Sequence, residues 1–446
     1  MGISSLEHVT SCGPEDPEKG LDNSVADEGE NSIIKPSIDR TAHPDGGLRA
    51  WGVVLGAFFI QFCSYGYIFF SYCLMTDYYT RIYMTAYSAS SIAWIGSVSP
   101  FLLFAIGLFV GRLYDRGYCM HLVYGGALLI SLSLFMLSLI KHNQYYGAFL
   151  CQGVGVGLGG GMIYLPSLVI VSQYFDKKRA VAMPIVTAGA SLGAVVSPIM
   201  LNSLLQRPNM TFAIVSSIYA SLITAILILA CYLMKPRFAP PKSYANYSES
   251  LRRFSRDTAF VTVTIGLALF GLGVLFPLFF LQLAAIENGL SKEFAFYSLV
   301  ILNGCGFFGR IACAFLTRRI GVDTLAMVSI VVCGGVVFAF MAIRSVLSVV
   351  FVGVVFGFFW GIFVATCSPL VAMLTDNMEE IGLRLGTAFA FAGLAELIGP
   401  PIMGALRSGN HWWRPAVFSG TLLIATGACI LAVRIISRRR KVSSTA

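Results

Sequence analysis

The sequence predicts an all-α membrane protein in which twelve transmembrane helices form two pseudo-symmetric six-helix bundles. Hydrophobic residues make up 57% of the chain and charged residues only 12%. Such a composition supplies many apolar segments of about 20 residues, the length that crosses a bilayer. The second half of the chain also repeats the first at one fixed offset, because Gly111, Pro166 and Pro198 match Ala314, Pro369 and Pro401. Paired halves of this kind are typical of membrane proteins built from internal repeats.

Twelve apolar segments separated by short polar loops are the expected spans. They lie at residues 50–76, 87–110, 119–140, 146–172, 180–205, 211–234, 258–284, 293–316, 322–343, 346–372, 385–406 and 415–437. Residues 1–44 are polar and carry an acidic run, which predicts a disordered cytoplasmic tail rather than a signal peptide. The predicted order is this tail, an N-terminal six-helix bundle at 45–234, a cytoplasmic linker at 235–257, a C-terminal six-helix bundle at 258–437 and a basic tail at 438–446.

The positions of Lys and Arg predict the orientation of the chain. Most of those outside the spans fall in the two terminal segments, the linker and the loops after spans 2, 4, 8 and 10, which share one side of the membrane. The positive-inside rule makes this side cytoplasmic, so both termini are expected there, in a multi-pass protein of the plasma membrane. The net charge of +9 is spread over short loops. We therefore expect the protein to contact the lipid bilayer and not nucleic acid. We also expect it to be a monomer.

Neither metal chemistry nor catalysis is expected. Most of the 11 cysteines fall inside spans and form no CxxC pair or cluster with His, so they are interpreted as small apolar core residues. None of the five His residues lies in the middle of a span, and an intramembrane enzyme would need such a base or a carboxylate pair. We expect no cofactor and no metal. Asn209, in Asn-Met-Thr after span 5, is a candidate glycosylation site.

The segment Gly111 to Arg116, which reads G-x-L-x-D-R, ends span 2. Asp115 and Arg116 could be a solvated helix cap, but a degenerate copy with Arg318 and Arg319 occupies the same place in the other half. The pattern resembles the loop between helices 2 and 3 of the major facilitator superfamily. This resemblance implies that Gly111, Asp115, Arg116, Arg318 and Arg319 hold one state of an alternating-access cycle through charge-assisted bonds.

Two further motifs resemble the monocarboxylate porter family, in its fungal branch. Asp45-Gly46-Gly47 and Trp51 lead into span 1, and Tyr174-Phe175-Asp176-Lys177-Lys178-Arg179 leads into span 5. The resemblance implies a secondary active transporter of a small organic solute, with helices 1, 4, 7 and 10 around a site near the midplane. Two features of animal members are missing. Phe69 stands where they have a substrate-related Lys, and Gly306 stands where they have an Asp.

Arg310 in span 8 is the strongest single candidate for a substrate-binding residue. A charge inside a span is costly unless a polar cavity or a partner receives it. The resemblance implies a contact to a carboxylate of the substrate, whereas the alternative is a structural brace or a side chain that snorkels to the cytoplasmic end. Glu396, the only acid well inside span 11, can pair with Arg310, carry a proton or brace helices. Asn303, Phe69 and Tyr72 complete the expected substrate-binding residues.

Glycine and proline in the spans predict packing and bending. Gly153, Gly157 and Gly161 recur every fourth residue in span 4, which favours close helix contact. Pro166 and Pro369, at matched places in spans 4 and 10, each remove a backbone hydrogen bond and are either hinges or passive kinks.

The solute that fits these residues is a moderately apolar organic anion, and protons are the coupling ion that we consider. Uptake of a carboxylate or vitamin-like nutrient and export of a secondary metabolite remain alternatives. A non-transporting nutrient sensor is the remote one.

Overall fold

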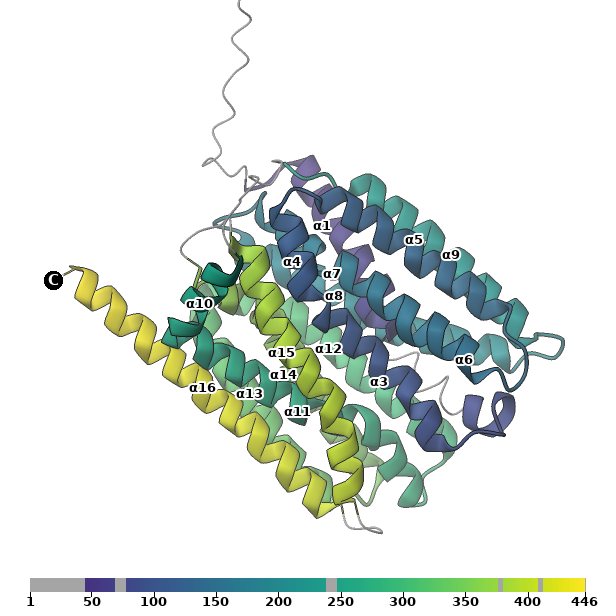
Figure 1. Ribbon diagram of the computed structural model, residues 1–446. Helices are drawn as coiled ribbons and strands as arrows, with labels where there is room; N and C mark the ends of the chain where they lie inside the picture. The colour runs from purple at the N-terminus through teal and green to yellow at the C-terminus, as the bar shows by residue number, and fades with distance from the viewer. Residues whose placement is uncertain (1–44, 69–77, 238–246, 376–379, 408–411, 446) are drawn as a thin grey trace, which may run out of the picture. The chain divides into compact units, whose positions relative to one another are not determined.

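The computed structural model describes residues 45–68, 78–237, 247–375, 380–407 and 412–445, and these residues form helices and no strands (Figure 1). Twelve helical segments in this part of the chain are long and apolar enough to cross a membrane, which confirms the predicted number. The predicted tail at 1–44 lies outside the described residues.

The first six spans fall between Leu48 and Leu233. They comprise α1 (Leu48–Gln61) with the π-helix η1 (Phe62–Gly66), α3 (Ala89–Ala105) with α4 (Gly107–Asp115), α5 (Cys119–Ser138), α6 (Tyr145–Ala148) with the π-helix η3 (Phe149–Gly155) and α7 (Val156–Ser172), α8 (Arg179–Leu205) and α9 (Phe212–Leu233). A short π-helix, η2 (Tyr79–Tyr83), precedes α3. We call residues 48–233 the first half.

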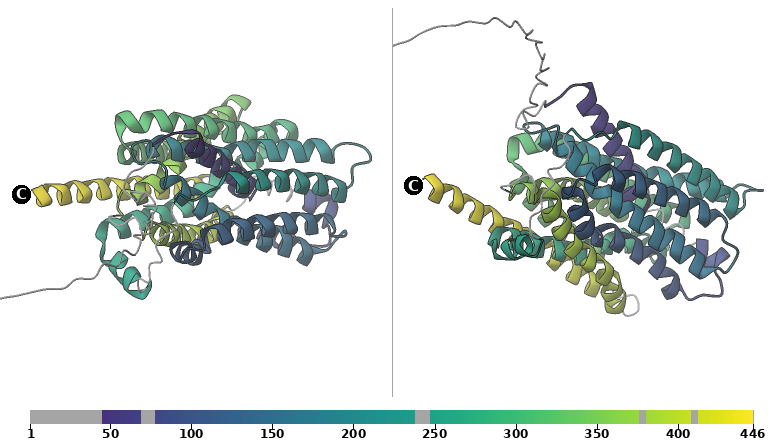
Figure 2. Two further views of the ribbon diagram at one scale, coloured as in Figure 1. Left: turned by 90° about the horizontal axis from the view of Figure 1, so that it is seen from above. Right: turned by 45° about the horizontal axis from the view of Figure 1, so that its top comes forward.

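The second half, which we define as residues 258–445, holds the other six spans. They are α11 (Thr258–Glu287), α12 (Lys292–Ile320), α13 (Val322–Ala339) with the 3₁₀-helix η4 (Phe340–Ala342), α14 (Val346–Ala372), α15 (Ile381–Leu406) and α16 (Trp413–Thr445). The helix α10 (Tyr247–Arg256) lies between the halves in sequence. The last helix, α16, runs on past the neighbouring helices, so the basic segment predicted at 438–446 continues the final span as helix as far as Thr445 (Figure 2).

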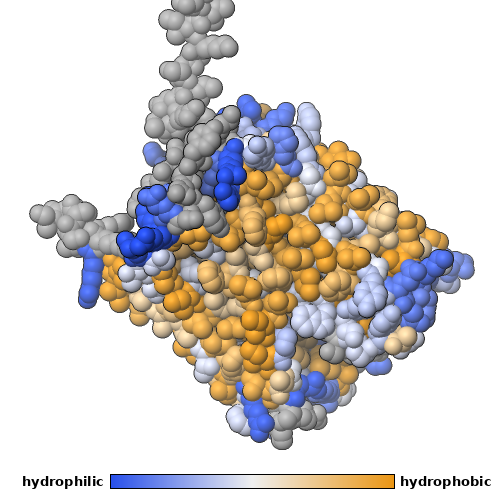
Figure 3. Space-filling view, viewed as in Figure 1, coloured by the Kyte–Doolittle hydropathy of each residue, from blue (hydrophilic) through white to orange (hydrophobic). Residues whose placement is uncertain are grey.

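Polar side chains define where several spans begin. Ser88 accepts a hydrogen bond from the backbone N–H of Ser91 at the start of α3, and Asp257 accepts one from Ala259 at the start of α11. Such caps satisfy backbone donors that have no partner within the helix. Between the caps the surface is apolar, and on the face shown in Figure 3 hydrophobic residues cover the middle while hydrophilic residues gather near the helix ends. This surface suits contact with lipid.

Glycines bring neighbouring helices into backbone contact, as the sequence predicts for span 4. A β-carbon at Gly157 would lie 2.9 Å from the carbonyl oxygen of Ser99, and one at Gly161 would lie 2.8 Å from that of Leu103. Both acceptors belong to α3. Because a larger residue at either position would push the helices apart, this face of α7 requires glycine.

The halves make their most extensive contacts at two places, and α14 on α8 and α15 on α7 add smaller ones. In one, α12 packs on α8, and in the other α15 packs on α3 and α4. We call the end at which α4 ends and α8, α11 and α15 begin the linker end, because α10 leads into it. The candidate binding and gating residues of the second half lie along α12 and α15, the helices with the most extensive contacts to the first half.

Candidate functional site

Arg310 lies in the interior of the bundle, where α12 faces α8. Its side chain is 1% exposed, and its Nη1 donates a hydrogen bond across the halves to the carbonyl oxygen of Thr187. Nε and Nη2 have no hydrogen-bond partner, and within the described residues Arg310 forms no ion pair. The guanidinium therefore does not snorkel to the linker end. It bridges the halves through one donor and leaves the charge and the donors of its other edge unused.

Two aromatic rings lie against this guanidinium. The Arg310 Cζ is 5.9 Å from the ring centroid of Tyr65, in η1 of the first half, and 5.4 Å from that of Trp360, in α14 of the second half. A cation over an aromatic face is attracted by the ring quadrupole. This attraction stabilises the buried charge in part, but the rings cannot accept the hydrogen bonds that Nε and Nη2 offer.

The tyrosine beside Arg310 belongs to a layer of four buried rings that crosses the two halves. Tyr65 stacks on Tyr164 at 6.0 Å, and Phe104 meets Tyr164 edge-on at 5.5 Å. Phe389, in α15, lies 5.8 Å from Phe104 and 6.1 Å from Tyr164. The layer gives the interior beside Arg310 an aromatic and apolar lining.

Glu396 is the second ionisable group in this interior, and it is 4% exposed. Its Oε2 has no hydrogen-bond partner, and the described residues include no ion pair between Glu396 and Arg310. In this structure the two residues are therefore not paired, contrary to one of the three roles considered for Glu396. Both lie within electrostatic range of Tyr65 and Tyr164. A carboxylate without a partner is costly to bury, so this surrounding favours a neutral carboxylic acid.

Asn303 lies on α12, two turns from Arg310, and is buried. Its Nδ2 donates to the carbonyl oxygen of Leu299 at 2.8 Å, and its Oδ1 has no partner. Phe69 and Tyr72, the other expected substrate-binding residues, lie outside the described residues.

The linker end holds the predicted gating residues of the first half close to α15. A β-carbon at Gly111 would lie 2.5 Å from the carbonyl oxygen of Gly382, and one at Gly382 would lie 2.7 Å from Oδ1 of Asp115. A β-carbon at Gly386 would lie 2.8 Å from the carbonyl carbon of Gly107. The backbones of α4 and α15 therefore touch at two levels, one turn apart, with the carboxylate of Asp115 at the first turn of α15.

The three predicted arginines of this end lie differently. Arg116 is the exposed C-cap of α4, and Arg318 and Arg319 are exposed in the last turn of α12. Their neighbour Thr317 makes the cross-half contact, because its Oγ1 donates to the carbonyl oxygen of Ala180 at 3.1 Å. Sequence reasoning missed Thr317, Gly382 and Gly386, although Gly382-x-x-x-Gly386 is itself a helix-packing pattern.

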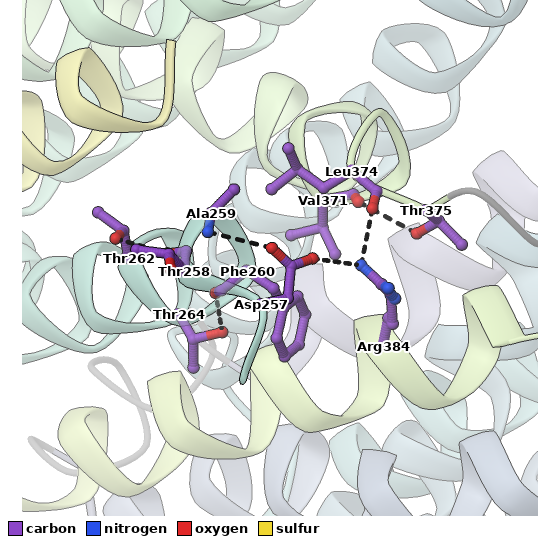
Figure 4. A network of polar contacts seen from close by, with 10 residues as sticks. All are labelled: Asp257, Thr258, Ala259, Phe260, Thr262, Thr264, Val371, Leu374, Thr375 and Arg384. Carbon is purple, nitrogen blue, oxygen red and sulfur yellow. Dashed lines mark hydrogen bonds and ion pairs between the residues drawn. The ribbon is translucent and has the colours of Figure 1, made fainter. Parts of the chain in front are cut away.

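A separate polar network lies at the linker end of the second half (Figure 4). Nη1 of Arg384 donates to Oδ2 of Asp257 at 3.2 Å and to the carbonyl oxygen of Leu374 at 2.7 Å. The buried ring of Phe254, in α10, lies 4.6 Å from the Arg384 guanidinium. Arg253 of α10 also forms an ion pair with Glu380. This network ties α10 and the start of α11 to the start of α15.

The remaining predicted residues are the two hinge prolines and the candidate glycosylation site. Pro166 lies inside α7 and Pro369 inside α14, near the linker end of each helix. Asn209 is exposed in the loop before α9 and has a positive φ of 73°.

A family model described as Major Facilitator Superfamily matches residues 53–373, which is most of the chain. The chain belongs to the major facilitator superfamily. It is 31% identical over 421 residues to "MFS transporter asaE" of Aspergillus flavus, covering 92% of this chain and 94% of that protein. It is 32% identical over 411 residues to "Aspyridones efflux protein apdF" of Emericella nidulans, covering 92% and 82%. The "Fujikurins efflux protein" of Gibberella fujikuroi is 31% identical over 432 residues, covering 95% and 89%.

Solved structures share the fold at low sequence identity. The transporter FucP in the outward conformation superposes with a TM-score of 0.67 at 15% identity, covering 86% of this chain and 98% of that one. The human organic anion transporter MFSD10 superposes with a TM-score of 0.64 at 16% identity, covering 86% and 97%. The protein is thus a multi-pass membrane transporter of the superfamily.

Proposed function

We propose that this transporter exports an acidic organic compound of the secondary-metabolite kind, and that Arg310 binds its anionic group. The observation that carries this proposal is the buried guanidinium with two unused donors and no ion pair. A buried charge of this kind is stabilised when an anion brings both opposite charge and hydrogen-bond acceptors. The relatives named as efflux proteins support export over uptake of a nutrient.

The position of Arg310 between the halves supports transport by alternating access. Its hydrogen bond to Thr187, the Thr317 contact to Ala180 and the α4–α15 contact all join the halves in the part of each helix nearer the linker end. We take the structure as the state closed at that end. The linker end can open only if these contacts break. Arg310 then loses its hydrogen bond to Thr187, and the transported anion remains as its partner. With the linker cytoplasmic, this state faces outward.

Glu396 provides a proton site for coupling. An anion bound at Arg310 would add negative charge beside Tyr65 and Tyr164, and this would favour the neutral form of Glu396 in the same interior. Without the anion, the unneutralised charge of Arg310 in the same interior makes the neutral form of Glu396 less favourable than it is with the anion bound. Anion binding and protonation therefore support each other, and the acid crosses as an electroneutral pair driven by its own gradient.

The finer assignments belong to the same proposal. The signatures before spans 1 and 5 support a monocarboxylate porter-like subtype, with Glu396 as its proton site. Residues 45–234 and 258–437 would move as two bundles, with Pro166 and Pro369 as hinges, in a monomer of the plasma membrane.

Export tests the proposal directly in a fungal host that makes an acidic metabolite. Cells with the wild-type protein should release the acid, and cells with Arg310→Ala should retain it. Arg344→Ala, which removes an exposed arginine from the loop before α14, is the matched control and should release the acid normally. Equal release by Arg310→Ala at equal protein levels would contradict the role of Arg310. Release of no acid by any variant would contradict export.

A further inference from the structure

We infer that the site takes flat, conjugated acids whose anionic group presents two adjacent oxygens, and that Tyr65 and Trp360 make this selection. The inference rests on the proposed function, because it assigns a substrate class to the same Arg310 site. Four features of the interior carry it: the free edge of the guanidinium, the two rings, the missing side chain at residue 306 and the local helix geometry at Tyr65.

The free donors of Arg310 lie on one edge of its guanidinium. Nε–H and the nearer Nη2–H point in the same direction in this planar group, and Thr187 takes the other edge through Nη1. Two parallel donors match two oxygens that lie side by side in one plane, as in a carboxylate or the enolate of a 1,3-dicarbonyl. A single alkoxide would use only one of these two donors.

The rings of Tyr65 and Trp360 extend the selection beyond the anionic group. Both rings lie beside the guanidinium, 5.9 and 5.4 Å from Cζ, and in this proposal the ligand atoms next to the anionic group pass beside them. A flat conjugated ligand can stack on the rings of Tyr65 and Trp360. A puckered saturated ring system with the same number of carbons is thicker and cannot contact both rings closely. Tyr164 and Phe104 continue the aromatic lining behind Tyr65.

Gly306, one turn before Arg310, leaves space for the indole. A β-carbon at this position would lie 3.5 Å from a ring carbon of Trp360 and 3.4 Å from Oγ of Ser191. A longer side chain would therefore meet the indole, and an acidic one would also neutralise Arg310. The Oγ of Ser191 is buried and has no hydrogen-bond partner, so a further polar atom of the ligand can be received there.

Helix geometry fixes Tyr65 in place. It lies in η1, where the backbone changes from α to π hydrogen bonding, a local widening that is frequent at functional sites. Gly66 follows it, and a β-carbon there would lie 2.6 Å from the carbonyl oxygen of Ala190. This contact holds η1 against α8. The same helix therefore positions the ring of Tyr65 and, through Thr187, accepts the hydrogen bond from Arg310.

Three probes separate shape from charge in a binding assay on the purified full chain. They are 2-naphthoate, which is flat and anionic, decahydro-2-naphthoate, which is saturated and anionic, and 2-naphthamide, which is flat and neutral. Dissociation constants come from the ligand-dependent rise in melting temperature. We expect 2-naphthoate to bind about tenfold more tightly than its saturated analogue, as two aromatic contacts allow, and 2-naphthamide to bind far more weakly than either acid.

The variants assign the preference to residues. Tyr65→Leu and Trp360→Leu should each reduce it to about threefold or less, while Tyr65→Phe should retain it because the ring remains. Tyr297→Leu, at an exposed tyrosine of α12, is the control and should leave it unchanged. The melting temperature without ligand reports whether each variant folds, and Tyr65→Phe keeps the test valid if a leucine variant does not.

Two outcomes would overturn the inference. If both acids bind equally to the wild type and Arg310→Ala abolishes both, the proposed anion site stands and the preference for flat acids is wrong. If the preference survives in Tyr65→Leu and Trp360→Leu, other residues make the selection. Failure of the proposed function has a different signature, which is binding of both acids that Arg310→Ala leaves intact.

Discussion

The contact between α4 and α15 is tight enough that one methyl group should shift the conformational equilibrium. A β-carbon at Gly386 would lie 2.8 Å from the carbonyl carbon of Gly107, and because this neighbour is backbone it cannot rotate away. Overpacking of this kind costs about 1–3 kcal/mol. Once the halves part at the linker end, the methyl group meets no such neighbour. Gly386→Ala should therefore lower the closed state about 5- to 150-fold relative to the open one.

Distances between spin labels measure this shift. Labels at Tyr118 and Ile320, both exposed at the linker end and in different halves, should show a larger long-distance population in Gly386→Ala than in wild type. Gly404→Ala lies on the same helix, where no atom is within 4 Å of the added β-carbon, and should match the wild type. It also controls for the helix propensity of alanine. If both variants give the same distance distribution, the glycine contact does not set the closed state.

Four further substitutions, one of them a control, probe charges in the bundle. Asp257→Ala leaves the guanidinium of Arg384 buried without its carboxylate and should cost about 3 kcal/mol of stability, measured as a lower thermal unfolding midpoint, whereas Asp323→Ala, at a more exposed ion pair with Arg434, should cost about 1 kcal/mol or less. Equal losses would contradict the burial argument. Glu396→Gln should keep anion exchange, which needs no net proton movement, but abolish the stimulation of net transport by a pH gradient. Stimulation equal to that of the wild type would exclude this proton site. Gly306→Asp should weaken anion binding at least about tenfold in a titration, about 1.4 kcal/mol, and unchanged affinity would mean that no carboxylate can reach Arg310 from that turn.

The sequence predicts the spans because lipid imposes a length and a polarity on each of them. Hydropathy therefore suffices to find α1 or α14 as elements, and the charge cost alone marks Arg310 as a residue that needs a special environment. Bounds are less well predicted where a helix continues into water. Span 2 runs to Asp115 and the last helix to Thr445, because polar residues beyond the bilayer can extend a helix that the bilayer has already formed.

Which aromatic rings lie against Arg310 could not be predicted in the same way. Aromatic residues are common in spans, and neither Tyr65 nor Trp360 carries a signal of its partner, since the three residues come from three different helices. The sequence around Tyr65 does not predict its π-helical turn. The sequence identifies Glu396 as an acid inside a span, but whether it pairs with Arg310 depends on how α12 and α15 are placed in the packed structure.

Counterflow in proteoliposomes tests the central claim most directly. Vesicles loaded with unlabelled 2-naphthoate and diluted into labelled 2-naphthoate should accumulate the label transiently when they contain the wild-type protein, because exchange needs only binding and alternating access. Arg310→Ala should abolish this accumulation, and Arg344→Ala should retain it. Accumulation at the wild-type rate in Arg310→Ala would contradict the assignment of the anion site to Arg310.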